Sequence, residues 1–174
     1  MPSRTALLVV DVQTGLLRAD PPLHERDRFL ANMCRLIESA RASQVPVVYL
    51  RHETTGGELA PGMPGWAIDP AVAPQSGDIV VDKRHNDGFH ATTLQEELQH
   101  MGTLELVVAG VQTEFCVDTT CRRAYSLGYQ VTLVGDGHTT FDTEVLSAAQ
   151  IIAHHNRTLG VRLTRVTDTD DLAW

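Results

Sequence analysis

Asp11, Lys83 and Cys116 carry side chains that together could perform covalent catalysis. A cysteine thiolate is a nucleophile, a carboxylate can take the thiol proton, and an ammonium can hold the carboxylate ionised and lower the thiol pKa. Each residue stands close behind a short apolar run, at residues 6–10, 78–81 and 104–109. The alternative for Asp11 and Lys83 is a pair of loop charges or a structural ion pair.

Cys116 lies where an apolar run stops at Gly110 and an amphipathic segment continues to Leu127. A strand that passes into a helix in this way places the first helical turn at the carboxyl edge of a sheet, where unpaired backbone N–H groups favour an anion. We therefore expect the thiol to be partly ionised at neutral pH. The alternative is that Cys116 only fills space in the core, as single cysteines often do.

Apolar runs of strand length alternate with helical patterns along the chain, as in repeated βαβ units. The predicted strands are residues 6–10, 45–50, 78–81, 104–109, 130–134 and 161–165, and the predicted helices lie around 29–40 and at 92–100, 114–127 and 144–157. Right-handed crossovers then give a parallel sheet with helices on both faces. Because the carboxyl ends of parallel strands share one edge, Asp11, Lys83 and Cys116 are expected to converge there.

Length and charge narrow the class of protein. A chain of 174 residues with 43% hydrophobic content is expected to form one domain, spanning 1–174. A net charge of -8 disfavours nucleic acid and anionic membranes as partners and favours a small molecule. The apolar run at 6–10 is too short to cross a bilayer, and the beginning of the chain lacks a secretory pattern, so we expect a cytoplasmic protein.

The three cysteines are not expected to form a disulfide framework or a zinc site. Cys34, Cys116 and Cys121 are odd in number and lack the paired spacing of a zinc site. Cys116 and Cys121 are five residues apart, which places them about 140° apart around a helix, so they are not expected to form a redox pair.

A series of motifs follows along nearly the whole chain. They are LVVDVQ at residues 8–13, VVYLRHE at 47–53, GMPGW at 62–66, Lys83 followed by Phe89, and AGVQTEFCV at 109–117. Their order and spacing resemble those of the isochorismatase-like cysteine hydrolases, which include nicotinamidases and N-carbamoylsarcosine amidohydrolases. The resemblance implies a three-layer, doubly wound α/β fold whose six-stranded parallel sheet has the order 3-2-1-4-5-6.

The resemblance also implies roles for individual residues. Asp11, Lys83 and Cys116 take the positions of the family's catalytic triad. A cis peptide between Val111 and Gln112 is implied, which would turn the Gln112 N–H toward the site. Together with the Cys116 N–H it would form an oxyanion hole. The expected reaction is cleavage of an amide, lactam or carbamoyl C–N bond through a Cys116 thioester.

Substrate contacts are expected from Gln13, His52, Trp66, Asn86, Phe89 and Phe115. The segment 52–74 is rich in Gly and Pro and lacks periodicity, which is typical of a lid or binding loop. Trp66 within it either forms an aromatic wall of the pocket or anchors the loop. Arg51 is expected to pair with a substrate carboxylate or an acidic side chain, and His138 either touches substrate or belongs to a Gly-rich turn.

No metal and no other cofactor are expected. Nicotinamidases of this superfamily bind a divalent ion through an Asp-x-His pair and a later His, but Leu50 stands here in place of that Asp. One remaining imidazole, that of His52, does not make a zinc site, which needs three or four protein ligands. The sequence therefore disfavours a nicotinamidase.

Two other functions remain open. The first is hydrolysis of a vinyl ether, as in isochorismatase proper, which uses the Asp and Lys without a thiol. The second is a non-catalytic binding protein with the same fold. The resemblance also implies a homodimer or larger homo-oligomer, for which the apolar segment 144–157 and Trp174 could supply an interface.

Overall fold

Six strands pair in parallel in the computed structural model, which describes residues 4–174. They are β1 (Thr5–Val10), β2 (Val47–His52), β3 (Ile79–Lys83), β4 (Glu105–Val111), β5 (Gln130–Thr139) and β6 (Arg165–Thr167). Their order in the sheet is β3-β2-β1-β4-β5-β6. The predicted fold class, a doubly wound α/β fold with strand order 3-2-1-4-5-6, is confirmed.

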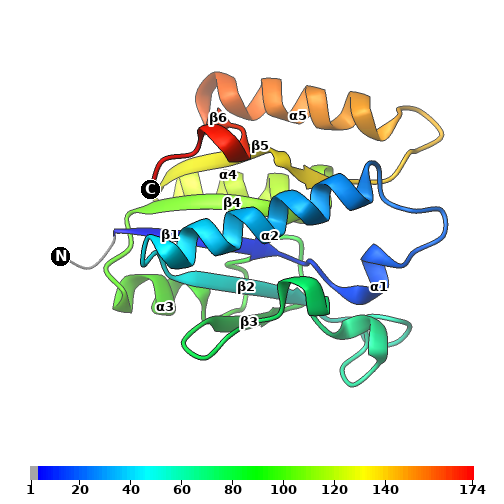
Figure 1. Cartoon of the computed structure of the whole chain (residues 1–174), viewed down its shortest axis with the longest axis horizontal. Coiled ribbons are helices and arrows are strands. Elements are labelled where there is room, and N and C mark those ends of the chain that lie inside the picture. Colours follow the sequence, from blue (N-terminus) through cyan, green and yellow to red (C-terminus); the bar gives the residue numbers. More distant parts are fainter. Residues whose placement is uncertain (1–3) are drawn as a thin grey trace.

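Helices cover both faces of this sheet (Figure 1). They are α1 (Thr14–Leu17), α2 (Arg26–Ala42), α3 (Leu94–His100), α4 (Asp118–Ser126) and α5 (Ala148–Arg162). In the view of Figure 1, α2 crosses in front of the strands, α3 and α4 lie behind them, and α5 runs along the top. Within residues 4–174, no helix has the length and apolar character needed to cross a bilayer.

The central strand β1 shows why the sheet is covered on both sides. Leu7 and Val9 pack into the cluster that contains the apolar face of α2, whereas Leu8 and Val10 pack into the cluster of α3, α4 and α5. All of these residues are fully buried. A continuous apolar run rather than an alternating one is what a strand buried on both faces requires.

Two predicted elements near the end of the chain are wrong in their bounds. Residues 161–165 were expected as a strand, but α5 continues to Arg162 and β6 occupies Arg165–Thr167. The helix expected at 144–157 begins only at Ala148. Its start is fixed by a capping box, in which the side chains of Ser147 and Gln150 bond to each other's backbone N–H.

The two elements next to Cys116 also differ from their predictions. The expected helix at 114–127 begins with a π-helical turn, Thr113–Val117, before α4 starts. Strand β5 continues past 134 to Thr139, because a shift in the register of β4 and β5 lets the pairing resume at Gly110 with His138. His138 therefore lies on a strand and not in a Gly-rich turn.

Candidate active site

The site lies at the carboxyl edge of the sheet, where β1, β3 and β4 end. Asp11 follows β1 in the left-handed region, with a φ of 50°, a conformation that non-glycine residues adopt rarely and mostly at functional sites. Gly110 has a φ of 140°, and a Cβ there would collide with the carbonyl group of Val10. Glycine at this position lets β4 approach β1 closely, which brings the Cys116 turn beside Asp11.

The structure brings Asp11, Lys83 and Cys116 together. The ammonium Nζ of Lys83 lies 2.8 Å from Oδ2 of Asp11 and 3.2 Å from Sγ of Cys116. The side chains of the ion pair are 0% and 2% exposed for Lys83 and Asp11. Burial of this kind makes the pair's attraction strong and its separation costly.

The thiol of Cys116 is protonated in the resting site. Its pKa is raised to about 12, first by burial and then by the negative charge of Asp11, which together outweigh the opposing effect of Lys83. The expectation of a partly ionised thiol at neutral pH is therefore wrong, because it considered the helical turn and neglected desolvation. Attack by Cys116 consequently needs a base that takes its proton.

Asp11 is placed to be that base. Its Oδ1 atom is buried and has no hydrogen-bond partner among residues 4–174, while Oδ2 is held by Lys83. A carboxylate oxygen of Asp11 and the Sγ of Cys116 lie within 4.8 Å of each other. A buried acceptor without a partner is uncommon, and it leaves this carboxylate able to receive a proton.

His52 extends this cluster toward the cavity. Its Nδ1 lies 3.2 Å from Nζ of Lys83, which also donates to the carbonyl oxygen of His85 at 3.1 Å. Burial and the charge of Lys83 lower the pKa of His52, so the ring is neutral. Because Nδ1 accepts from the ammonium, the ring proton belongs on Nε2.

A cavity of about 350 Å³ opens over Cys116. The residues that line it are Asp11, Leu16, His52, Thr54, Leu59, Asn86, Val111, Gln112, Phe115 and Cys116. Of the six predicted substrate contacts, His52, Asn86 and Phe115 are in this lining. The Oδ1 atom of Asn86 lies 3.7 Å from Sγ of Cys116, and Phe115 is 48% exposed at the rim.

Gln13 and Trp66 do not line the cavity. They contact residues of β2 and of the loop that follows it. The buried Gln13 amide accepts from the N–H of His52 at 2.8 Å and donates to the carbonyl oxygens of His52 and Trp66 at 2.9 and 2.8 Å. The Arg51 guanidinium stacks on the Trp66 ring at 3.5 Å and pairs with Asp82. These contacts describe Trp66 as an anchor of the loop, one of the two interpretations that the sequence left open.

Phe89 also lies away from the cavity. It is buried in the core, where its ring stacks on Tyr129 with 5.9 Å between ring centroids. Four lining residues were not anticipated as such: Leu16, Val111, Thr54 and Leu59. The last two belong to the segment expected to form a lid, so the loop was identified although its contact residues were not.

The turn that carries Cys116 begins at a cis peptide between Val111 and Gln112. The carbonyl oxygen of Gln112 accepts hydrogen bonds from the N–H groups of Phe115 and Val117 at 3.2 Å. Gln112 itself lines the cavity next to Cys116. Its role as an oxyanion donor stays a prediction.

Asp11, His52 and Cys116 each offer a potential metal-ligand atom within 4.8 Å of the others. The ammonium of Lys83 lies among them, however, 2.8 Å from the carboxylate and 3.2 Å from both the thiol and the imidazole. A divalent ion placed there would meet this cation at close range. Leu50, at the position of a nicotinamidase ligand, is an apolar residue of the core. These residues do not fit a divalent metal site.

Comparisons with known proteins agree with the fold. Residues 5–167 match the isochorismatase domain model. A streptothricin hydrolase of Streptomyces noursei is 40% identical over 138 residues, 79% of this chain and 50% of that protein. Nicotinamidase 3 of Arabidopsis thaliana is 29% identical over 165 residues, 82% of this chain and 77% of that protein. The chain thus spans about half the length of the streptothricin hydrolases that it matches.

Among solved structures, an isochorismatase from Pseudomonas putida superimposes with a TM-score of 0.91 and 34% identity. The match covers 99% of this chain and 93% of that structure. The domain match extends over nearly the whole chain, and the strand order is that of a doubly wound sheet. The chain belongs to the isochorismatase family.

Proposed function

We propose that this protein is a metal-independent cysteine hydrolase that cleaves the C–N bond of a small amide, lactam or carbamoyl compound. The observation that carries the proposal is the buried Lys83 ammonium, which contacts both the Asp11 carboxylate and the Cys116 thiol, and these two residues line a cavity. The family supports hydrolysis in general, and one relative is named as a nicotinamidase.

Acylation begins with proton transfer from Cys116 to the free oxygen of Asp11. As the proton leaves, Sγ attacks the substrate carbonyl carbon, a C–S bond forms, and the carbonyl oxygen becomes an oxyanion. The N–H groups of Gln112 and Cys116 stabilise that oxyanion. When the tetrahedral intermediate collapses, the C–N bond breaks and Asp11 returns its proton to the leaving nitrogen. The products of this half-reaction are a thioester and ammonia or an amine; when the substrate is a lactam, the amine stays attached to the acyl group.

Deacylation uses the same carboxylate. Asp11 takes a proton from water, the resulting hydroxide attacks the thioester carbon, and the C–S bond breaks to release a carboxylic acid. The departing thiolate recovers the proton from Asp11, so the enzyme returns to its starting state. Lys83 keeps its charge throughout and stabilises each anionic form of Asp11 and Cys116.

The setting of this reaction is also part of the proposal. We propose a small molecule as the only substrate class, because about 350 Å³ holds a compound of modest size. A cytoplasmic location suits an enzyme that depends on a free thiol. Assembly as a homodimer or larger oligomer and a single domain over 1–174 stay predictions.

The test is a panel of small primary amides, lactams, N-carbamoyl compounds and vinyl ethers, incubated with wild type and Cys116→Ala. The readouts are release of ammonia or amine, opening of the lactam ring, and formation of the alcohol and carbonyl compound from the vinyl ether. C–N cleavage by wild type that is lost in Cys116→Ala supports the proposal. Vinyl-ether cleavage that persists in Cys116→Ala supports the thiol-independent alternative instead. Binding of panel compounds without turnover of any would contradict the proposal and favour a binding protein.

A further inference from the structure

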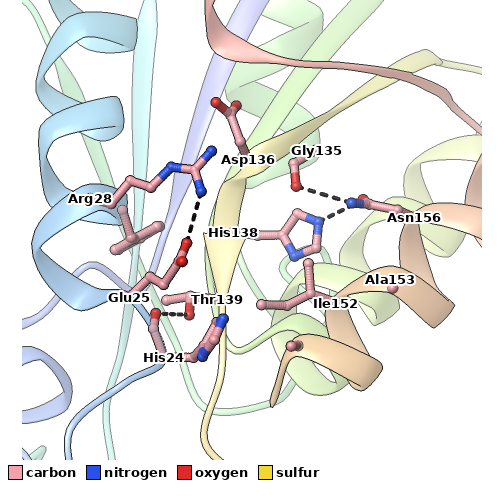
Figure 2. A pocket seen from close by; sticks show the side chains of 12 residues that line it. His24, Glu25, Arg28, Gly135, Asp136, His138, Thr139, Ile152, Ala153 and Asn156 are labelled. Carbon is pink, nitrogen blue, oxygen red and sulfur yellow. Dashed lines mark hydrogen bonds and ion pairs between the residues drawn. The ribbon is translucent and has the colours of Figure 1, made fainter. Parts of the chain in front are cut away.

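His138 is a buried histidine that the catalytic scheme does not use. It lies on β5 and is 3% exposed. Its ring nitrogens both have partners: Nδ1 lies 2.8 Å from the Thr113 hydroxyl, and Nε2 lies 2.8 Å from Oδ1 of Asn156. Figure 2 shows the ring between β5 and α5, with Asn156 reaching from the helix to the strand.

The direction of these hydrogen bonds follows from Asn156. Its Nδ2 donates to the carbonyl oxygen of Gly135 at 3.0 Å, so its Oδ1 faces His138 and accepts from it (Figure 2). The ring proton therefore lies on Nε2, and Nδ1 must accept from the hydroxyl of Thr113. Burial, which lowers the pKa of His138 to about 4, keeps this neutral arrangement at neutral pH.

Thr113 connects the histidine to the catalytic turn. It follows Gln112 directly and is the first residue of the π-helical turn Thr113–Val117, which carries Cys116. Its side chain is buried, and its hydroxyl is held by the ring of His138. The hydrogen bonds thus run from α5 through β5 to the backbone that presents the nucleophile and the predicted oxyanion donor.

We infer that His138 is a positioning residue, which acts through Thr113 to hold the Gln112 N–H and the Cys116 thiol in the geometry that the transition state needs. This inference rests on the proposed function. A misplacement of the turn weakens interactions with the developing oxyanion more than it weakens ground-state binding, so the loss belongs in kcat.

The surroundings of His138 allow this effect to be separated from substrate binding. His138 and Asn156 border a second cavity of about 290 Å³ (Figure 2). Among the described residues, this cavity shares no lining residue with the cavity over Cys116. Neither Thr113 nor His138 lines the cavity over Cys116, so substitutions at these two positions remove no side chain that faces the substrate.

The experiment compares Thr113→Val and His138→Leu with wild type. Each variant removes the hydrogen bond, and each is expected to lower kcat about tenfold, the equivalent of one hydrogen bond, with KM within about twofold. The double variant is expected to be no slower than the slower single one, because both remove the same link. His138→Asn, which keeps an acceptor near the position of Nδ1, is expected to recover part of kcat.

Thr140→Val is the matched control. Thr140 is fully buried and its hydroxyl has no hydrogen-bond partner in the part of the chain that the structure describes. The same Thr-to-Val change there is expected to leave kcat and KM as in wild type. Equal kcat values for Thr113→Val and Thr140→Val would overturn the inference while the proposed function stands.

Hydrogen exchange of residues 110–117 gives a second measurement that needs no substrate. Faster exchange of this segment in Thr113→Val and His138→Leu than in Thr140→Val supports a positioning role. Equal exchange in all three variants contradicts it. If wild type proves inactive on every compound, the proposed function fails, and the exchange experiment still decides whether His138 holds the turn.

Discussion

Two polar clusters contact the turn that carries Cys116, and their hydrogen-bonding groups are paired to different degrees. The catalytic cluster consists of Asp11, Lys83 and Cys116, and the histidine cluster consists of Thr113, His138 and Asn156. In the catalytic cluster, Oδ1 of Asp11 has no hydrogen-bond partner among residues 4–174, and four acceptors surround the Lys83 ammonium, which has three hydrogens. In the histidine cluster, both ring nitrogens and the Asn156 amide have partners.

This difference suits the catalytic cluster to proton transfer and the histidine cluster to holding the turn in place. A buried group without a partner is costly and is retained where a proton must move. A buried network whose members are paired is rigid and fixes one arrangement of the backbone. The turn that carries Cys116 therefore contacts the catalytic cluster, whose protonation can change, and the histidine cluster, which stays neutral at neutral pH. The predictions below test this contrast, from the largest expected effect to the smallest.

Asp11→Asn is expected to give opposite effects on two reactions of Cys116. Turnover falls by about 10³-fold, because the general base is lost. Alkylation of Cys116 by iodoacetamide at pH 8 becomes faster, because the Asp11 charge that helps to raise the thiol pKa has gone. Mass spectrometry of the tryptic peptides measures alkylation, with Cys34 as the internal reference. A parallel loss of both reactions would mean that the site has collapsed.

Lys83→Met is expected to lower the free energy of unfolding by about 3–5 kcal/mol, because it leaves the Asp11 carboxylate buried without its partner. Urea denaturation measures the loss. The double variant Asp11→Asn/Lys83→Met serves as the control, since it removes both charges and should recover much of the stability. A loss below about 1 kcal/mol in Lys83→Met would contradict the view that the pair is buried as a unit.

The free energy of unfolding is expected to fall at acidic pH, because His138 is neutral in the folded protein. The pKa of His138 is lowered to about 4 in the folded chain. Between the usual pKa of about 6.5 and pH 4, His138 is therefore protonated in the unfolded chain and neutral in the folded chain. The contribution of this group to stability is full above that range and falls as the pH drops, by about 2 kcal/mol between pH 7 and pH 4.5. Urea denaturation at pH 7 and pH 4.5 measures it, and His138→Leu should lack this part of the dependence. Identical pH profiles would contradict the assignment.

Ser147→Ala lies outside both clusters and is expected to have the smallest effect. Loss of the capping box should cost about 1 kcal/mol in the free energy of unfolding, because Ser147 accepts from the N–H of Gln150 at the start of α5. The kcat value should not change. A fall in kcat would show that the catalytic turn responds to any loosening of α5, and not to the His138 link in particular.

The sequence could predict a parallel sheet from its alternating strand and helix patterns, whereas the strand order came from the family resemblance. The convergence of Asp11, Lys83 and Cys116 follows because parallel strands end at one edge of the sheet. The sequence could not predict the protonation state of Cys116. The sequence around Cys116 indicates a helical turn that favours an anion. The pKa of the thiol depends instead on burial and on Asp11, which is distant in the sequence but close in the fold. Burial and long-range charge appear only when the chain is folded.

The packing of individual side chains was harder to predict than the positions of the strand ends. Phe89 was expected at the pocket, and Trp66 was expected either there or as an anchor of the loop. Phe89 packs in the core on Tyr129, and the Trp66 ring stacks under Arg51. An aromatic residue near a site satisfies the same pattern whether it faces the cavity or the core. The pairing of Thr113 with His138 was also out of reach, because it depends on the register shift between β4 and β5.

The measurement that tests the central claim most directly is intact mass spectrometry of wild type and Cys116→Ala, quenched in acid during incubation with the C–N compounds. The account predicts a covalent adduct with the mass of the acyl group on wild type, located at Cys116, together with amine or ammonia release. It predicts neither adduct nor release in Cys116→Ala, whose fold stays intact. Release of product by Cys116→Ala at the wild-type rate, with no adduct on either protein, would contradict covalent catalysis by this thiol.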